Sequence, residues 1–190
     1  MPRYVLTGAP GAGKSAILRL LEQAGHLVVE EAATDVIALR LALGEPEPWT
    51  GPEFIDGILR LQRHRELLAK PAGEDDPVFF DRSPLCTLAL SRFLGLPPSQ
   101  LLADEIDRVM RDQVYCETVF FVRNLGFVTP TAARRISLAD SLVFEDVHER
   151  TYRELGFRLI EVPAGPLAGR VEQVRRVAHR SELRRRHPCR

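Results

Sequence analysis

A chain of 190 residues is long enough to form one domain with a sizeable hydrophobic core. Hydrophobic residues make up 45% of the sequence and charged residues 27%, which is ordinary for a soluble globular protein. The formal net charge is zero, which excludes a global electrostatic field that would attract nucleic acid or membranes.

Apolar runs and turn residues predict that strands and helices alternate along the chain. In the first half we expect a strand at 3–7, a helix at 14–24 ended by Gly25, a strand at 26–30, a helix at 32–43, an irregular proline-rich loop at 44–52 and a helix at 53–69. In the second half we expect a strand at 77–81, a helix at 85–94, a helix from Ser99 to about Asp112, a strand at 117–123, a loop at 124–136, a helix from Ser137 to Leu155, a strand at 157–162 and a last helix from Pro166.

The predicted strands are continuous apolar runs, without the alternation of a half-exposed sheet. This pattern is typical of a parallel sheet covered by helices on both faces, so the sequence predicts a three-layer α/β domain with five parallel strands. We expect one domain over residues 1–180, followed by an arginine-rich tail at 181–190. The arginines near this end favour a solvated helix face and a frayed tail, and a polyanion-binding tail is the alternative.

The segment GAPGAGKS, Gly8–Ser15, matches the phosphate-loop pattern G-x-x-x-x-G-K-[ST] and lies between a predicted strand and a predicted helix. Glycines let the backbone turn tightly and aim its N–H groups inward, the lysine meets the β- and γ-phosphates, and the serine supplies an oxygen to Mg²⁺. The residues predicted to bind the nucleotide here are Gly8, Ala9, Pro10, Gly11, Ala12, Gly13, Lys14, Ser15 and Ala16.

Lysine usage supports this interpretation. Among 26 basic residues only Lys14 and Lys70 are lysines, and one of them stands where a compact point charge is needed. The same segment also contains G-x-G-x-x-A, a weak dinucleotide pattern, but Lys14 followed by Ser15 favours a triphosphate. Neither lysine lies in an N-K-x-D string, so guanine recognition of the GTPase type is disfavoured.

Two opposite charges, Asp81 and Arg82, end the predicted strand at 77–81. In a phosphate-loop sheet the strand beside the loop ends in a carboxylate that reaches Mg²⁺, so Asp81 and Ser15 are the predicted metal ligands. The alternative is that Asp81 caps a helix or is a surface charge. Hydrolytic ATPases commonly place a glutamate after this aspartate. Arg82 cannot act as a base, but it can clamp a phosphate or a substrate.

Several segments in order resemble a known family: VLTGAPGAGKS, HLVVEEAA, VFFDRSPLCTLA, ARR at 133–135 and YRELGFRLIEVPAGPLAGRV. Together they resemble the kinase-like AAA-domain P-loop family, which is related to ribosylnicotinamide kinase domains and more distantly to deoxynucleoside and thymidylate kinases. The resemblance spans Val5 to Val171 and implies a thymidylate-kinase-like fold, Mg·ATP binding and phosphoryl transfer to a small molecule. The segment DRSP, 81–84, departs from the D-R-G of many relatives, so the resemblance does not identify the acceptor.

Further site residues follow from strand ends and from this resemblance. A carboxylate at the end of the second strand can accept the proton of the acceptor hydroxyl. The resemblance places this carboxylate at Glu31, and Glu30 is the second candidate. The alternative is that both acids only stabilise the start of the following helix through its dipole. The resemblance also implies a lid carrying Arg134 and Arg135, which would neutralise charge on the transferred group, or else a solvated loop. Further expectations are that Arg123 stacks on adenine, that Pro163 begins a base-side loop, and that Trp49, Phe54 and Arg60 cover the acceptor, with packing favoured for the two aromatics.

The cysteines and histidines indicate neither a disulfide framework nor a metal centre. Cys86, Cys116 and Cys189 include no C-x-x-C pair, and the five histidines form no ligand-spaced cluster. No signal-peptide layout is visible, and no apolar run approaches the roughly 20 residues that span a bilayer. We therefore expect a cytoplasmic protein.

Three functions are consistent with these patterns. The favoured one is a kinase that transfers the γ-phosphate of Mg·ATP to a hydroxyl of a nucleoside-like or other metabolite, and slow ATPase activity is compatible with it. The second is a regulatory nucleotide-binding switch that acts through a protein partner. The third is an ATPase or kinase that acts on nucleic acid. The sequence names neither the acceptor nor the oligomeric state.

Overall fold

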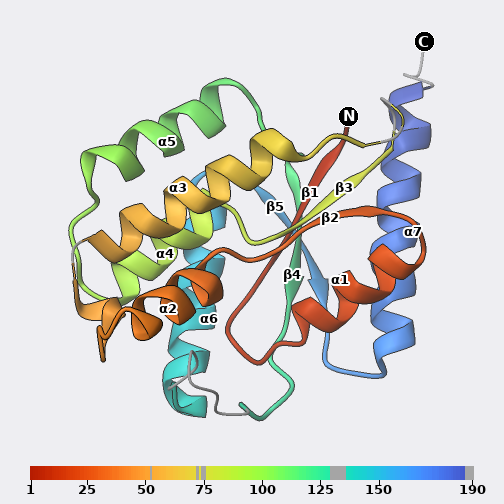
Figure 1. The fold of residues 1–190 in the computed structure, drawn as a ribbon. Helices are drawn as coiled ribbons and strands as arrows, with labels where there is room; N and C mark the ends of the chain where they lie inside the picture. The colour runs from red at the N-terminus through yellow and green to blue at the C-terminus, as the bar shows by residue number, and fades with distance from the viewer. Residues whose placement is uncertain (52, 72, 74–75, 129–135, 187–190) are drawn as a thin grey trace.

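The computed structural model describes residues 1–51, 53–71, 73, 76–128 and 136–186, without the side chains of 181–186. These residues form an α/β fold in which a central sheet lies between two layers of helices (Figure 1). Within the described ranges, no helix combines the length and apolar character needed to cross a membrane.

Five strands form one sheet in the order β2-β3-β1-β4-β5, and all neighbouring pairs are parallel. The strands are β1 Arg3–Thr7, β2 Leu27–Val29, β3 Val78–Asp81, β4 Thr118–Val122 and β5 Arg158–Val162. The predicted five-stranded parallel sheet is therefore confirmed. Because Leu6 of β1 pairs with Asp81 of β3, the charged end of β3 lies beside the strand that leads into the phosphate loop.

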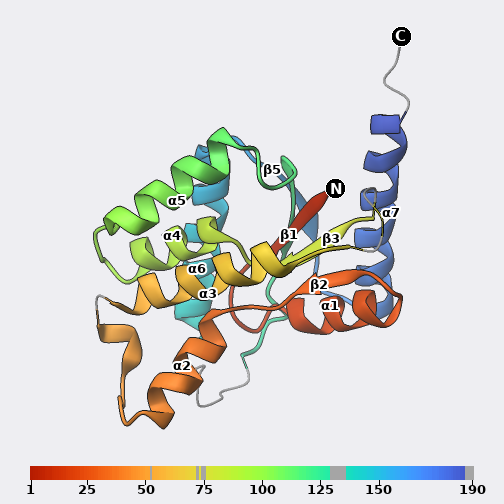
Figure 2. The same cartoon turned by 45° about the horizontal axis from the view of Figure 1, so that its top comes forward.

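Helices cover both faces of the sheet (Figures 1 and 2). Their bounds are α1 Lys14–Gln23, α2 Ala33–Ala42, α3 Glu53–Leu68, α4 Pro84–Phe93, α5 Gln100–Arg111, α6 Leu138–Glu154 and α7 Leu167–Arg186. Helices α1 and α7 pack on one face, and α2 to α6 lie toward the other (Figure 1). Alternation along β1 explains the two layers, since Tyr4 and Leu6 belong to the core under α1 and α7, whereas Val5 belongs to the other core.

The predicted elements shift by a residue or two at their ends, and one segment was predicted wrongly. The loop at 44–52 was expected to be irregular, but Pro48–Thr50 form a 3-10 turn, η1. A proline at the first position of such a turn lacks only an N–H that would have no partner there. Ser83 caps α4 by accepting from the N–H of Leu85, and Pro84 follows at the position that proline tolerates.

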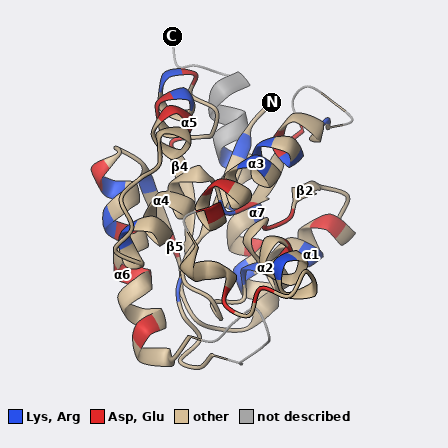
Figure 3. Cartoon of the chain, turned by 60° about the vertical axis from the view of Figure 1, so that its left-hand side comes forward, with Lys and Arg blue, Asp and Glu red and all other residues tan. Residues whose placement is uncertain are grey.

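The C-terminal helix and the surface charges bear on the predicted tail. Helix α7 continues through Arg186, so the expected tail begins as helix, and residues 187–190 lie outside the described part. Acidic and basic segments are mixed along α5 and α6 (Figure 3), in line with the net charge of zero.

Candidate active site

The phosphate loop joins β1 to α1 at the carboxyl edge of the sheet. Gly8, Gly11 and Gly13 have φ values of 126°, 86° and 82°, a region that other residues rarely adopt. Gly8 also lies against β4, because a Cβ there would be only 2.3 Å from the carbonyl oxygen of Val122. Glycine is therefore required at Gly8 by both conformation and space.

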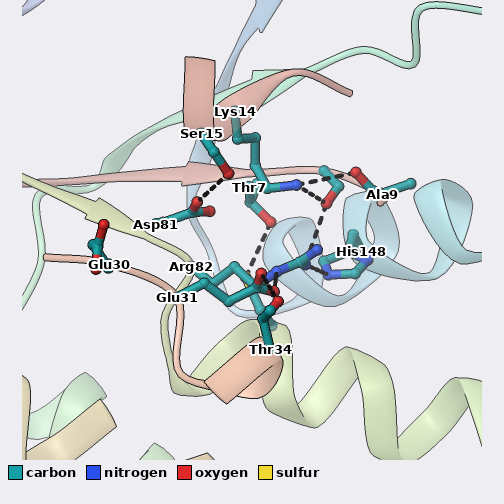
Figure 4. A network of polar contacts seen from close by, with 12 residues as sticks. Thr7, Ala9, Lys14, Ser15, Glu30, Glu31, Thr34, Asp81, Arg82 and His148 are labelled. Atoms are coloured by element: carbon teal, nitrogen blue, oxygen red, sulfur yellow. Dashed lines mark hydrogen bonds and ion pairs between the residues drawn. The ribbon is translucent and has the colours of Figure 1, made fainter. Parts of the chain in front are cut away.

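Lys14 begins α1 and turns its side chain back over the loop. Its Nζ donates to the carbonyl oxygens of Gly8 at 2.9 Å and Ala9 at 3.0 Å (Figure 4). Burial, together with the nearby positive charge of Arg82, lowers the pKa of Lys14 to about 8. Lys14 thus places a positive charge inside the loop, but it holds its proton less tightly than an exposed lysine.

Asp81 lies next to the first turn of α1. The hydroxyl of Ser15 donates to Oδ2 of Asp81 at 3.1 Å, while Oδ1 is buried and has no hydrogen-bond partner among the described residues. Burial and the nearby carboxylate of Glu31 raise the pKa of Asp81. A carboxylate with an unused buried oxygen beside a serine hydroxyl is suited to a hard cation, whose charge would restore its ionised form.

Arg82 connects the phosphate loop to two other elements. Its φ of 72° is unusual for a residue with a side chain. The guanidinium forms an ion pair with Glu31 through Nε, and NH1 donates to the carbonyl oxygen of Gly8 at 3.3 Å (Figure 4). NH1 also lies 3.2 Å from Nε2 of His148. Since Arg82 is held from three sides, its planar group is fixed beside the loop.

Of the two acids after β2, Glu31 joins this network and Glu30 does not. Glu31 accepts from Thr34 at 2.9 Å as well as from Arg82, and Arg82 and Lys14 lower its pKa against the opposing effect of burial. Glu30 lies apart from the network in Figure 4, with Arg19 4.0 Å away. Glu31 is therefore an ionised carboxylate at neutral pH that pairs with Arg82 and feels the charge of the loop lysine.

His148 on α6 was not found by sequence reasoning, because a single histidine in a helix has no distinguishing pattern. Its ring is fully buried, and Nδ1 lies 2.8 Å from the carbonyl oxygen of Phe144. A carbonyl can only accept, so Nδ1 carries the proton and Nε2 accepts from Arg82. Burial and the charge of Arg82 lower the pKa of His148 well below its usual range, so the ring is neutral.

A cavity of about 580 Å³ extends from the phosphate loop past Glu31 and Arg82. Beyond these charges its walls are mostly apolar: Ile37, Trp49, Phe54, Ile58, Leu90, Phe93, Leu94 and Phe144. Gln62 of α3 also lines this end. Its side chain is buried, and its Oε1 has no hydrogen-bond partner in the described part of the chain. Sequence reasoning missed Gln62. It placed Trp49 and Phe54 in the segment over the acceptor but favoured packing for both, and in the structure Phe54 belongs to a core cluster that Trp49 packs against while both also line the cavity.

The other predicted site residues lie outside the cavity or outside the described residues. Arg123 forms ion pairs with Glu145, Glu149 and Glu161, and covers the ring of Phe121 at 4.5 Å. These contacts give Arg123 a structural role, and adenine stacking stays a prediction.

Pro163 follows β5 and is exposed, and Arg60 lies near Asp56 of its own helix at 3.7 Å. Arg134 and Arg135 fall within the residues 129–135 that the structure does not describe.

The parallel sheet, the glycine loop and the lysine and serine that open α1 define a P-loop NTPase fold. The chain belongs to the AAA domain family, whose model matches residues 3–170. A search of curated proteins found no match.

Solved structures share the fold at low sequence identity. One is the NadR protein in complex with NAD and AMP-PNP, with a TM-score of 0.60 and 15% identity over 94% of this chain and 49% of NadR. Our chain thus spans about half the length of NadR. Deoxyadenosine kinase from M. mycoides with bound dCTP has a TM-score of 0.58 and 14% identity, and the match covers 93% of this chain and 98% of the kinase.

Proposed function

We propose that the protein is a small-molecule kinase that transfers the γ-phosphoryl group of Mg·ATP to a hydroxyl of a nucleoside-like acceptor. The observation that carries this proposal is the lining of the cavity. Part of the lining is the phosphate loop, and the rest is largely apolar wall from α2, η1, α3, α4 and α6 that the phosphates themselves do not need. A site for hydrolysis alone requires only water beside the phosphates, whereas a kinase requires room for a second molecule.

The phosphate end has suitable groups for the triphosphate and its cation. Lys14 would bind the β- and γ-phosphates, and backbone N–H groups of Gly11–Ser15 would surround them. Ser15 and Asp81 would hold Mg²⁺. No group of three or more metal-binding acidic, histidine or cysteine side chains occurs among the described residues, which suits an ion that takes its other ligands from phosphate and water. Bound there, Mg²⁺ would neutralise charge that develops on the phosphate oxygens.

Arg82 and Glu31 occupy the middle of the cavity, where the two molecules would meet. Arg82 is charged at every working pH, and its anchors at Glu31 and His148 aim the guanidinium toward the transferred group. In the proposed reaction the acceptor oxygen bonds to the γ-phosphorus while the bond to the bridging oxygen breaks and ADP leaves. The hydroxyl proton passes to Glu31, the ionised carboxylate within this end of the site.

The apolar end favours a flat acceptor with a polar edge. Aromatic rings of Trp49, Phe54 and Phe93 can pack against a planar ring. The amide of Gln62 offers both a donor and an acceptor, since its orientation can reverse. Two structural neighbours are solved with nucleotides bound, deoxyadenosine kinase with dCTP and NadR with NAD and AMP-PNP, which supports a nucleotide-like ligand for this fold.

The test is to incubate the protein with Mg·ATP and pooled nucleosides and other hydroxyl metabolites, and to detect a phosphate adduct by mass spectrometry. We expect a phosphorylated nucleoside-like product together with ADP. Slow ATP hydrolysis that no metabolite accelerates would contradict the kinase proposal and favour a nucleotide-dependent switch.

The two lysines offer a matched pair of variants for this assay. Lys14→Ala should abolish turnover, because it removes the charge that meets the β- and γ-phosphates. Lys70→Ala should leave turnover unchanged, because Lys70 is exposed and does not line the cavity. Full turnover in Lys14→Ala would contradict the assignment of the phosphate loop.

A further inference from the structure

Arg170 is a buried arginine that none of the proposed chemistry uses. It lies in the first turn of α7, and only 4% of its surface is exposed. Its NH2 donates to the carbonyl oxygen of Ala12 at 2.8 Å and to that of Arg123 at 3.2 Å. Arg170, 158 positions away from Ala12 in the sequence, therefore contacts the phosphate loop without lining the cavity.

The charge of Arg170 is not paired with a carboxylate among the described residues. Burial lowers its pKa, and its Nε is buried without a hydrogen-bond partner in the part of the chain that the structure describes. Arg123, close by, instead has three carboxylate partners. The helix dipole adds to the cost, because a cation is disfavoured in the first turn of a helix. An uncompensated buried charge in such a place is expensive, which points to a use for it.

The contact with Ala12 determines the direction of the next N–H group. The chain contains no cis peptide bond among the described residues, and in a trans peptide the C=O and N–H groups point in opposite directions. Because the C=O of Ala12 points toward Arg170, the N–H of Gly13 points away from it. Gly13 is itself one of the residues that line the cavity.

Glycine at position 13 makes this arrangement possible. A Cβ there would lie 2.9 Å from NH1 of Arg170, so a larger residue would push the guanidinium away from the loop. The second bond, to the carbonyl oxygen of Arg123, joins the loop to the end of β4.

We propose that Arg170 is a positioning residue for the polyphosphate of the nucleotide. Its guanidinium clamps the Ala12–Gly13 peptide so that the N–H of Gly13 faces the phosphates, and its unpaired charge adds to the positive potential behind the loop. The proposal rests on the nucleotide binding of the proposed function, and it concerns ground-state binding of phosphate rather than the transfer step.

The test compares Arg170→Met with Arg176→Met, an exposed arginine on the same helix that loses the same charge. Calorimetry would give the Kd of each protein for Mg·ATP and for inorganic tripolyphosphate. We expect Arg170→Met to raise both values about 10- to 100-fold, the range for a lost charge-assisted contact, and Arg176→Met to leave them unchanged. Thermal melts without ligand, and with Mg·ATP, separate this role from a structural one.

A structural arginine would lower the melting temperature without ligand and leave the increase caused by Mg·ATP intact. A positioning arginine would reduce the increase caused by Mg·ATP, because the loop would no longer be held in its phosphate-binding conformation. If Arg170→Met does not fold, Arg170→Lys keeps the charge but not the two-carbonyl clamp, and wild-type affinity in that variant would overturn the proposal.

Wild-type affinity in a folded Arg170→Met would also overturn it and leave the proposed function standing. A wild-type protein that binds neither ligand would overturn both.

Discussion

Nucleotide affinity should depend on the protonation of Lys14. Burial and Arg82 lower its pKa to about 8, from a usual value of 10.5, while the nearby carboxylates Asp81 and Glu31 act in the opposite direction. A bound triphosphate stabilises the charged form, so binding raises this pKa and the protein takes up a proton. Affinity should therefore be constant below pH 8 and fall as the pH rises above it.

The size of the effect follows from the pKa. One pH unit above it, about a tenth of the nucleotide-free protein carries the proton, so the Kd at pH 9 should be about tenfold higher than at pH 7. The same shift predicts that the free energy of unfolding of the nucleotide-free protein increases as the pH rises from 8 to 10.5. Across that interval the unfolded chain binds more protons than the folded one.

The assay is calorimetric titration with a non-hydrolysable ATP analogue and Mg²⁺, in two buffers that differ in ionisation enthalpy. Buffer-dependent heat should correspond to uptake of about 0.1 proton at pH 7 and about 0.9 at pH 9. Lys14→Met should bind weakly at both values and show no such dependence. A wild-type Kd that stays constant from pH 7 to 9, without buffer-dependent heat, would refute the reasoning.

Three further predictions concern the transfer step. Glu31→Gln should keep ATP affinity but lower the transfer rate about 10²–10⁴-fold, whereas Glu30→Gln should leave the rate near normal. The opposite result would assign the general base to Glu30. Asp81→Asn should lower the transfer rate, and excess Mg²⁺ should partly restore it in a titration; no response to Mg²⁺ would argue against a metal ligand. Arg134→Ala or Arg135→Ala should lower kcat about 10²–10³-fold with little change in nucleotide Kd, and full kcat in both would remove the catalytic lid from the mechanism.

Local patterns in the sequence were sufficient to predict the elements and the phosphate loop. Strands β1 to β4 are short, largely apolar runs that end at glycine or charged residues, and each of these signals depends on a few neighbouring positions. Strand β5 departs from the predicted apolar pattern, because Arg158 and Glu161 in it are exposed. The loop is equally local, because Gly8, Lys14 and Ser15 act through their spacing. Only the turn at Pro48–Thr50 was predicted wrongly among the segments discussed, because a proline-rich stretch excludes long regular structure but not a single turn.

The sequence by itself therefore determined that the chain forms a parallel α/β fold with a phosphate loop and an acidic end on β3. Tertiary structure alone decided which distant side chains meet there. His148 reaches Arg82 because α6 packs over the sheet edge, and Arg170 reaches Ala12 because α7 lies behind the loop. Glu31 rather than Glu30 pairs with Arg82, although both residues follow the end of β2 at Val29. Such contacts depend on strand order and helix packing, which join residues far apart in the sequence and leave no periodic or spaced pattern along it.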